Sequence, residues 1–122
     1  MTPSRVTDLI PFLHVSDVET SISFYEQLGL EVDDTYREDG RVVWASMRSG
    51  SAALMLAEAP EPIDPSGGRH FLYTEDLAGL RNRLVQVGWE PPEIEDGSPG
   101  PKHEMSICDP DRHFLTIAQI EP

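Results

Sequence analysis

The feature that most constrains the fold of this chain is an internal repeat. The segment Val15-Ser16-Asp17-Val18 aligns with Thr74-Glu75-Asp76-Leu77 at an offset of 59 residues. In each copy a glycine follows the aspartate after 12 residues, at Gly29 and at Gly88. A fixed offset of this kind indicates two copies of one supersecondary unit, and the alternative is two unrelated amphipathic helices with ordinary caps.

Each copy of the repeat predicts an amphipathic helix. The aspartate stands where a carboxylate can accept the unpaired backbone N–H groups of the first turn, and the glycine stands where the helix can end in a left-handed conformation. Between them, apolar side chains recur at helical spacing. These side chains are Val18, Ile22, Tyr25 and Leu28 in the first copy and Leu77, Leu80, Leu84 and Val87 in the second.

Short apolar segments bounded by turn residues predict strands around each helix. They span residues 9–15, 31–37, 42–48 and 52–57 in the first copy and residues 70–74, 90–95, 103–108 and 114–120 in the second. The predicted organisation is a first βαβββ module (residues 1–60), a proline- and glycine-rich linker (61–68) and a second βαβββ module (69–122), together one compact domain. The fold class is therefore α+β, with the helices on the outer side of the sheet.

Length and composition favour a cytoplasmic globular protein. The chain has 122 residues and a hydrophobic fraction of 39%, which is enough for a packed core. No apolar run approaches the length of a membrane-spanning helix, and the first residues do not resemble a signal peptide. The single cysteine, Cys108, excludes an internal disulfide framework and suits a reducing compartment.

The charge balance is strongly acidic. Nine Lys and Arg residues against 22 Asp and Glu residues give a formal net charge of −13. Such a surface repels phosphate backbones, so we expect no nucleic-acid partner. It attracts cationic ligands, although the acidity also has a simpler explanation in solubility.

Three motifs together resemble the vicinal-oxygen-chelate superfamily of glyoxalases, bleomycin-resistance proteins and dioxygenases. They are the helix-opening segment 15–25 that closes on Leu28-Gly29-Leu30, the segment 74–77 followed by Gly88, and the turn Asp109-Pro110-Asp111-Arg112-His113. The resemblance covers nearly the whole chain. It implies two modules whose mixed sheet curls around a cleft, and a homodimer.

The resemblance also shows where a catalytic metal would be bound. Enzymes of the superfamily generally hold a divalent ion with His, Gln and Glu side chains, and the matching positions here are Ile10, Ala57, Arg69 and Thr116. An aliphatic side chain, a cation and a hydroxyl do not form a ligand set for such an ion. We therefore expect no metal and no other cofactor, unless a register slip of one residue brings His70 into the cleft.

Alternation along the strands extends the cleft face from those positions. The expected lining is aromatic and sulfur-containing, with one imidazole and one guanidinium as polar groups, a mixture that suits a drug-sized ligand. The candidate ligand-binding residues are Phe12, His14, Trp44, Met55, Arg69, Phe71, Phe114 and Thr116.

Structural explanations exist for several of these residues. His14 also fits a hydrogen-bonded packing residue, and Phe12 and Trp44 fit the core. Arg69 also fits an ion pair with a buried carboxylate. Cys108 has no neighbouring sequence signal for activation, so an inert thiol is expected there.

The favoured hypothesis is a non-catalytic protein that binds and sequesters a small molecule. The resemblance suggests an antibiotic-type ligand, such as a bleomycin-like cationic drug, and a role in antibiotic resistance. The alternative is a glyoxalase- or dioxygenase-like lyase or isomerase, either with displaced metal ligands among His14, His70, His103 and Glu104 or with His14 as a metal-free base. A third hypothesis is a structural module that contributes a dimer surface.

Overall fold

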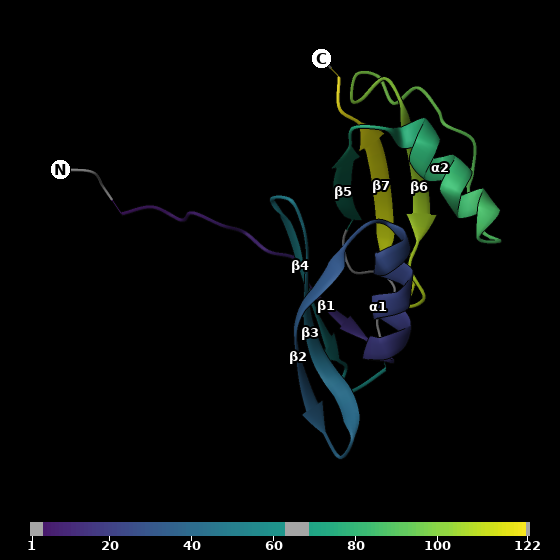
Figure 1. The fold of residues 1–122 in the computed structure, drawn as a ribbon. Coiled ribbons are helices and arrows are strands. Elements are labelled where there is room, and N and C mark those ends of the chain that lie inside the picture. Colours follow the sequence, from purple (N-terminus) through teal and green to yellow (C-terminus); the bar gives the residue numbers. More distant parts are fainter. Residues whose placement is uncertain (1–3, 63–68, 122) are drawn as a thin grey trace. The chain divides into compact units, whose positions relative to one another are not determined.

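The computed structural model describes residues 4–62 and 69–121. The chain divides into two compact units, residues 1–63 and 64–122, and each unit combines one sheet with one helix in its described part (Figure 1). The predicted α+β class is therefore confirmed. Most of the predicted linker 61–68 lies outside the described residues, and the module boundaries at 60 and 69 stay predictions.

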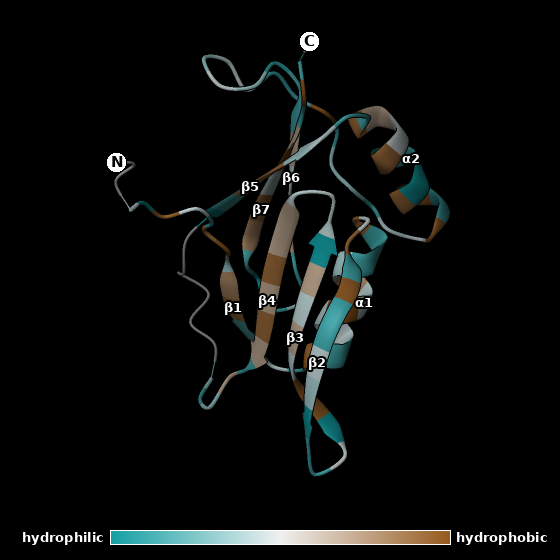
Figure 2. Cartoon of the chain, turned by 60° about the vertical axis from the view of Figure 1, so that its left-hand side comes forward, coloured by the Kyte–Doolittle hydropathy of each residue, from teal (hydrophilic) through white to brown (hydrophobic). Residues whose placement is uncertain are grey.

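The first unit has the predicted order of elements. These are β1 (Phe12–Val15), α1 (Val18–Gln27), β2 (Glu31–Glu38), β3 (Arg41–Ser49) and β4 (Ala52–Glu58). They form a four-stranded mixed sheet in the order β1-β4-β3-β2, with β1 parallel to β4 and the other neighbours antiparallel. Hydrophobic residues concentrate in β1 and β4, whereas β2 is largely hydrophilic (Figure 2).

Helix α1 has the start and the end that the repeat predicts. The Asp17 carboxylate accepts the backbone N–H of Thr20 at 3.1 Å, and Gly29 follows the last turn with a φ of +97°. The helix buries Val18 and Tyr25 against one face of the sheet. That face supplies fully buried side chains from three strands, namely Val15, Ala45, Met47 and Leu56.

The second unit contains β5 (Arg69–Thr74), α2 (Leu77–Gln86), β6 (Glu104–Cys108) and β7 (Phe114–Gln119). Its sheet has the order β5-β7-β6, with β5 parallel to β7 and β6 antiparallel to it. Helix α2 repeats the logic of α1, because Asp76 accepts the N–H of Gly79 at 2.9 Å and Gly88 has a φ of +97°.

The predicted strand at residues 90–95 is wrong. In its place the chain makes a single bridge between Glu95 and Glu104. Pro91 and Pro92 have no N–H groups to donate to a ladder, which excludes a regular strand there. The Arg81 side chain instead donates to the carbonyl oxygens of Pro92 (2.8 Å) and Pro91 (3.2 Å), so this segment is attached to α2.

The remaining strands begin and end within one residue of the prediction, except the first. Its predicted range of 9–15 shortens to Phe12–Val15. Pro11 lacks an N–H and joins the sheet only as an acceptor, receiving the N–H of Met55 on its carbonyl oxygen at 2.9 Å. Residues 4–11, which precede β1, form no strand.

Gln119 connects the end of β7 to the start of α2. Its Oε1 accepts the N–H of Leu77 at 2.8 Å, and its Nε2 donates to the carbonyl oxygens of Glu75 (2.7 Å) and Ile120 (3.0 Å). We expect Gln119→Ala to lower the free energy of unfolding by about 2 kcal/mol, because three hydrogen bonds are lost and a partly buried N–H loses its acceptor. Urea denaturation measures this free energy. Gln86 is exposed on α2, and Gln86→Ala is the control, with an expected change in the free energy of unfolding of about 0.5 kcal/mol or less.

Candidate functional site

The face of the first sheet opposite α1, which we call face A, carries two rows of side chains across all four strands. Residues paired across a sheet point to the same side, so the register defines each row. The first row is His14, Ala57, Trp44 and Tyr36. The second row is Phe12, Met55, Ser46 and Asp34.

Face A leaves large aromatic surface accessible. Phe12 is 49% exposed and Tyr36 is 59% exposed, while Trp44 and Met55 are half-buried. The Phe12 and His14 rings meet edge to face, with centroids 5.3 Å apart. Half-exposed rings beside polar groups provide what a partly apolar organic ligand needs, namely surfaces to stack on and groups that orient it.

The second sheet also has two sides. One side contributes Leu115, Ile117 and Met105 to the core, and we call the other side face B. It has three rows across β5, β7 and β6. The rows are Arg69, Phe114 and Cys108; Phe71, Thr116 and Ser106; and Tyr73, Ala118 and Glu104.

Face B combines exposed rings at its edge with polar contacts at its centre. Phe71 is 52% exposed and Tyr73 is 61% exposed. The Arg69 guanidinium lies over the Phe114 ring, 4.5 Å from its centroid, and no carboxylate of the described residues forms an ion pair with it. The hydroxyls of Ser106 and buried Thr116 are 3.0 Å apart and form a hydrogen bond.

The eight residues predicted to bind a ligand therefore divide evenly between the two faces. Face A contains Phe12, His14, Trp44 and Met55, and face B contains Arg69, Phe71, Phe114 and Thr116. Their part in binding stays a prediction.

Sequence reasoning did not include four polar or aromatic residues that share these faces, which are Asp34, Tyr36, Ser46 and Ser106. The register of β2 against β3 shifts between Val32 and Asp34 and again between Tyr36 and Arg37. A bulge changes which side a residue faces, and no feature of the sequence located these two bulges.

The histidines proposed as displaced metal ligands do not converge within the second unit. His70 pairs with Leu115 on the α2 side of the sheet, whereas Glu104 belongs to face B. His103 is exposed just before β6, with its Nδ1 3.3 Å from a carboxylate oxygen of Glu121. His70 accordingly points away from face B, as strand alternation predicts.

The side chains at the metal-ligand positions of the superfamily do not fit a divalent ion. Ala57 has no donor atom, Arg69 is a cation engaged with the Phe114 ring, and Thr116 offers a hydroxyl already bonded to Ser106. In the described ranges no group of three or more His, Cys, Asp or Glu residues is arranged to hold a metal ion. No step through a metal is therefore derived for this chain.

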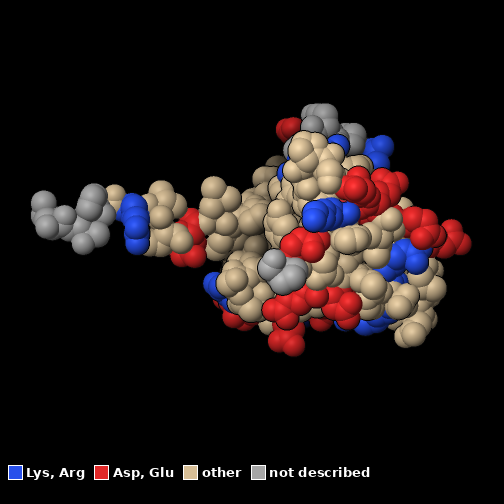
Figure 3. Space-filling model, turned by 90° about the horizontal axis from the view of Figure 1, so that it is seen from above, with Lys and Arg blue, Asp and Glu red and all other residues tan. Residues whose placement is uncertain are grey.

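Acidic side chains are prominent on the surface seen in Figure 3, and some of them have fixed partners. Arg41 donates to both carboxylate oxygens of Glu58 at 2.9 Å, and this hydrogen bonding lowers the pKa of Glu58 and raises the pKa of Arg41. Hydrogen bonds from the hydroxyl and the backbone N–H of Ser98 lower the pKa of Asp96. These carboxylates stay ionised to lower pH than ordinary ones, which maintains the acidic character of the surface.

The family follows from a match over most of the chain. The model of the Glyoxalase/Bleomycin resistance protein/Dioxygenase superfamily matches residues 7–117. The chain belongs to this superfamily. The match includes both copies of the repeat and nearly all strands of both sheets.

Several solved structures have a similar fold. A bleomycin resistance determinant encoded on the transposon Tn5 is 24% identical, with a TM-score of 0.75 over 96% of this chain and 100% of that chain. A bleomycin-binding protein from Streptomyces verticillus complexed with copper(II)-bleomycin is 18% identical, with a TM-score of 0.74 over 98% and 100%. TnmS3, an antibiotic binding protein from Streptomyces sp. CB03234, is 22% identical, with a TM-score of 0.73 over 99% of both chains.

Two further comparisons give negative results. No curated protein sequence matches this member of the superfamily significantly. Among the described residues, no helix combines the length and the apolar character needed to cross a membrane.

Proposed function

We propose that this superfamily member binds a drug-sized, partly apolar organic molecule of the antibiotic type and sequesters it without breaking a bond. The observation that carries the proposal is the set of large rings left accessible on the sheet faces opposite the helices. Four of them, Phe12, Tyr36, Phe71 and Tyr73, are about half exposed. Phe12 and Tyr36 belong to the first sheet and Phe71 and Tyr73 to the second, and exposed rings on a sheet face are unfavourable in water and typical of ligand-binding surfaces.

Two further observations support binding rather than catalysis. The metal-ligand positions of the superfamily carry Ala57, Arg69 and Thr116, which do not supply a ligand set. The structural relatives at TM-scores of 0.73–0.75 include two bleomycin proteins and an antibiotic binding protein. Sequestration needs only affinity, because a drug held on the protein no longer reaches its target.

The first experiment is isothermal titration of the purified protein with bleomycin and with a panel of aromatic antibiotics. We expect saturable binding of at least one compound with a Kd of about 1 μM or below, and recovery of that compound unchanged by chromatography after release. Conversion to a product would contradict sequestration and support the lyase or isomerase alternative. Absence of binding across the panel would contradict the antibiotic-type ligand.

The proposal includes a homodimer in the cytoplasm. Both sheets have two edge strands, β1 and β2 in the first and β5 and β6 in the second, and edges of this kind are available for pairing with a second copy. Light scattering on a size-exclusion column measures the mass directly. A mass of one chain at micromolar concentration would contradict this part of the proposal.

A further inference from the structure

One corner of face A combines a carboxylate with two aromatic rings. Asp34 and Tyr36 lie on the edge strand β2, two residues apart and on the same side, and Tyr36 is paired directly with Trp44 on β3. We infer that this corner, Asp34-Tyr36-Trp44, recognises a positively charged organic group of the ligand, such as an alkylammonium or quaternary ammonium group. The inference rests on the proposed function and adds the chemistry that the ligand must carry.

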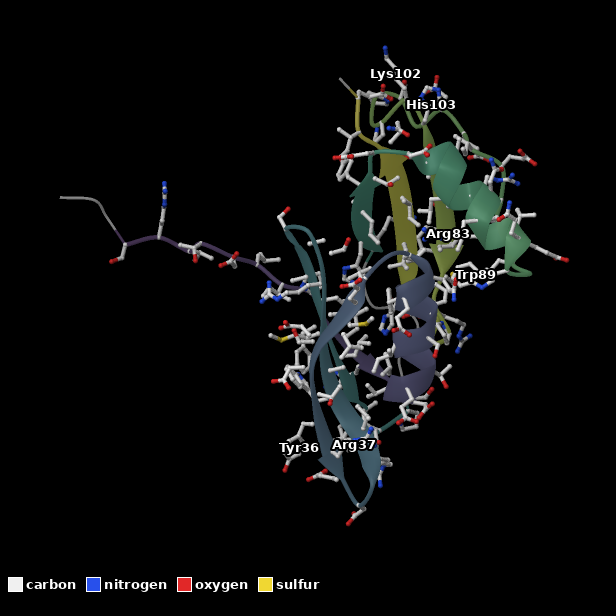
Figure 4. The ribbon with its side chains drawn as sticks, in the orientation of Figure 1. Tyr36, Arg37, Arg83, Trp89, Lys102 and His103 are labelled. Carbon is white, nitrogen blue, oxygen red and sulfur yellow. The ribbon has the colours of Figure 1, made fainter. Side chains whose placement is uncertain are left out.

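The three side chains are close enough to act on one group. Residues two apart on a strand are separated by about 7 Å, and directly opposed residues have Cβ atoms about 5 Å apart. Figure 4 shows Tyr36 projecting from β2 away from the side of α1, near the far end of the β2–β3 hairpin, with Arg37 on the other side. A substituted ammonium group between the rings therefore has Asp34 within reach.

Among the described residues Asp34 has no cationic partner, unlike its neighbour Asp33 and unlike Glu58 on β4. Asp33 is paired with Arg48 at 3.3 Å, and Glu58 is paired with Arg41 at 2.9 Å. One Asp34 oxygen accepts the N–H of Thr35 at 2.8 Å, and no Lys, Arg or His of the described chain forms an ion pair with this carboxylate. The charge of Asp34 is thus uncompensated beside exposed rings.

This arrangement selects by charge. A neutral ligand that covers the corner takes water from the Asp34 carboxylate and gives nothing back, which is unfavourable. A cation restores the lost interaction and is also attracted by the faces of the Tyr36 and Trp44 rings. The net charge of −13 further raises the rate at which cations approach and lowers that of anions.

The test uses two probes of nearly identical shape, 4-(trimethylammonio)phenol and 4-tert-butylphenol, which differ in one positive charge. Binding is followed by NMR through the indole N–H of Trp44, which Trp89→Phe distinguishes from the other tryptophan signal. We expect the cation to bind about tenfold more tightly than the neutral probe, a factor within the range of a cation–π contact combined with one carboxylate.

Two matched variants each remove one negative charge from the β2–β3 hairpin. Asp34→Asn keeps the acceptor for the Thr35 N–H and is expected to reduce the preference for the cation to about twofold. Asp39→Asn stands in the turn, where its φ of 51° suits asparagine, and is expected to leave the preference within twofold of the parent. Tyr36→Leu is expected to lower the affinity for the cationic probe about fivefold, whereas Tyr36→Phe is expected to retain that affinity.

Equal affinity of the parent protein for the two probes would overturn the cation site and leave the binding function intact. An equal loss of preference for the cation in Asp34→Asn and Asp39→Asn would do the same. No shift of Trp44 with either probe, combined with no binding in the antibiotic panel, would overturn the binding function together with this inference. Dispersed amide signals in each variant show that it is folded.

Discussion

Replacing Leu56 by alanine is expected to lower the free energy of unfolding by about 3 kcal/mol. Leu56 is fully buried on β4, between Leu13 on β1 and Ala45 on β3, on the side of the sheet that α1 covers. Removing three heavy atoms there leaves a cavity that the flanking strands cannot close without losing their register. Urea denaturation followed by circular dichroism measures the loss.

The neighbouring Met55 provides a matched control, because it lies on the same strand but points to face A and is half-buried. Met55→Ala is expected to cost about 1 kcal/mol or less, since much of the removed surface already contacts water. Similar losses for Leu56→Ala and Met55→Ala would contradict the assignment of the two faces.

The helices and most strands could be predicted because their signals are local. An aspartate cap, apolar residues at helical spacing and a glycine at the end are all contained in about a dozen residues, and both copies carry them. Asp17 and Asp76 accept N–H groups three residues later, and Gly29 and Gly88 share the same positive φ. The repeat strengthened each assignment because the two copies supported each other.

The same repeat produced the one strand that is wrong. The first copy has a strand directly after its helix, so the second copy was expected to have one at residues 90–95. Pro91 and Pro92 contradict it, since proline removes the N–H that a ladder needs. The tertiary contact that replaces the strand, from Arg81 to both proline carbonyl oxygens, joins residues ten and eleven positions apart and has no local signal.

The site was predictable where the strands are regular and not where they bulge. Strict alternation on β4 and β1 correctly separates Met55 from Leu56 and Phe12 from Leu13. On β2 the shift after Val32 places Asp34 opposite Ser46, so counting alternate residues along the strand fails. Such bulges depend on twist and on cross-strand packing, which a single sequence does not reveal.

Trp44→Ala is expected to reduce the affinity for the antibiotic identified by titration at least about 30-fold, which corresponds to about 2 kcal/mol. Trp44 is half-buried in a row between the small Ala57 and the exposed Tyr36, so part of its large ring system is accessible to a ligand. Trp44→Phe keeps a ring in that place and is expected to lose about threefold. Isothermal titration under identical conditions measures both.

Trp89→Ala is the control, because Trp89 is a half-buried tryptophan that follows α2 and belongs to neither face. Its affinity is expected to stay within about twofold of the parent, with any loss in stability read separately from the urea midpoint. If Trp44→Ala bound as tightly as the parent, stacking on face A would not contribute to binding, and the search for the ligand surface would turn to Phe71, Tyr73 and Arg69 on face B. An equal loss of affinity in both alanine variants, together with lowered urea midpoints, would indicate reduced folding rather than a lost contact with the ligand.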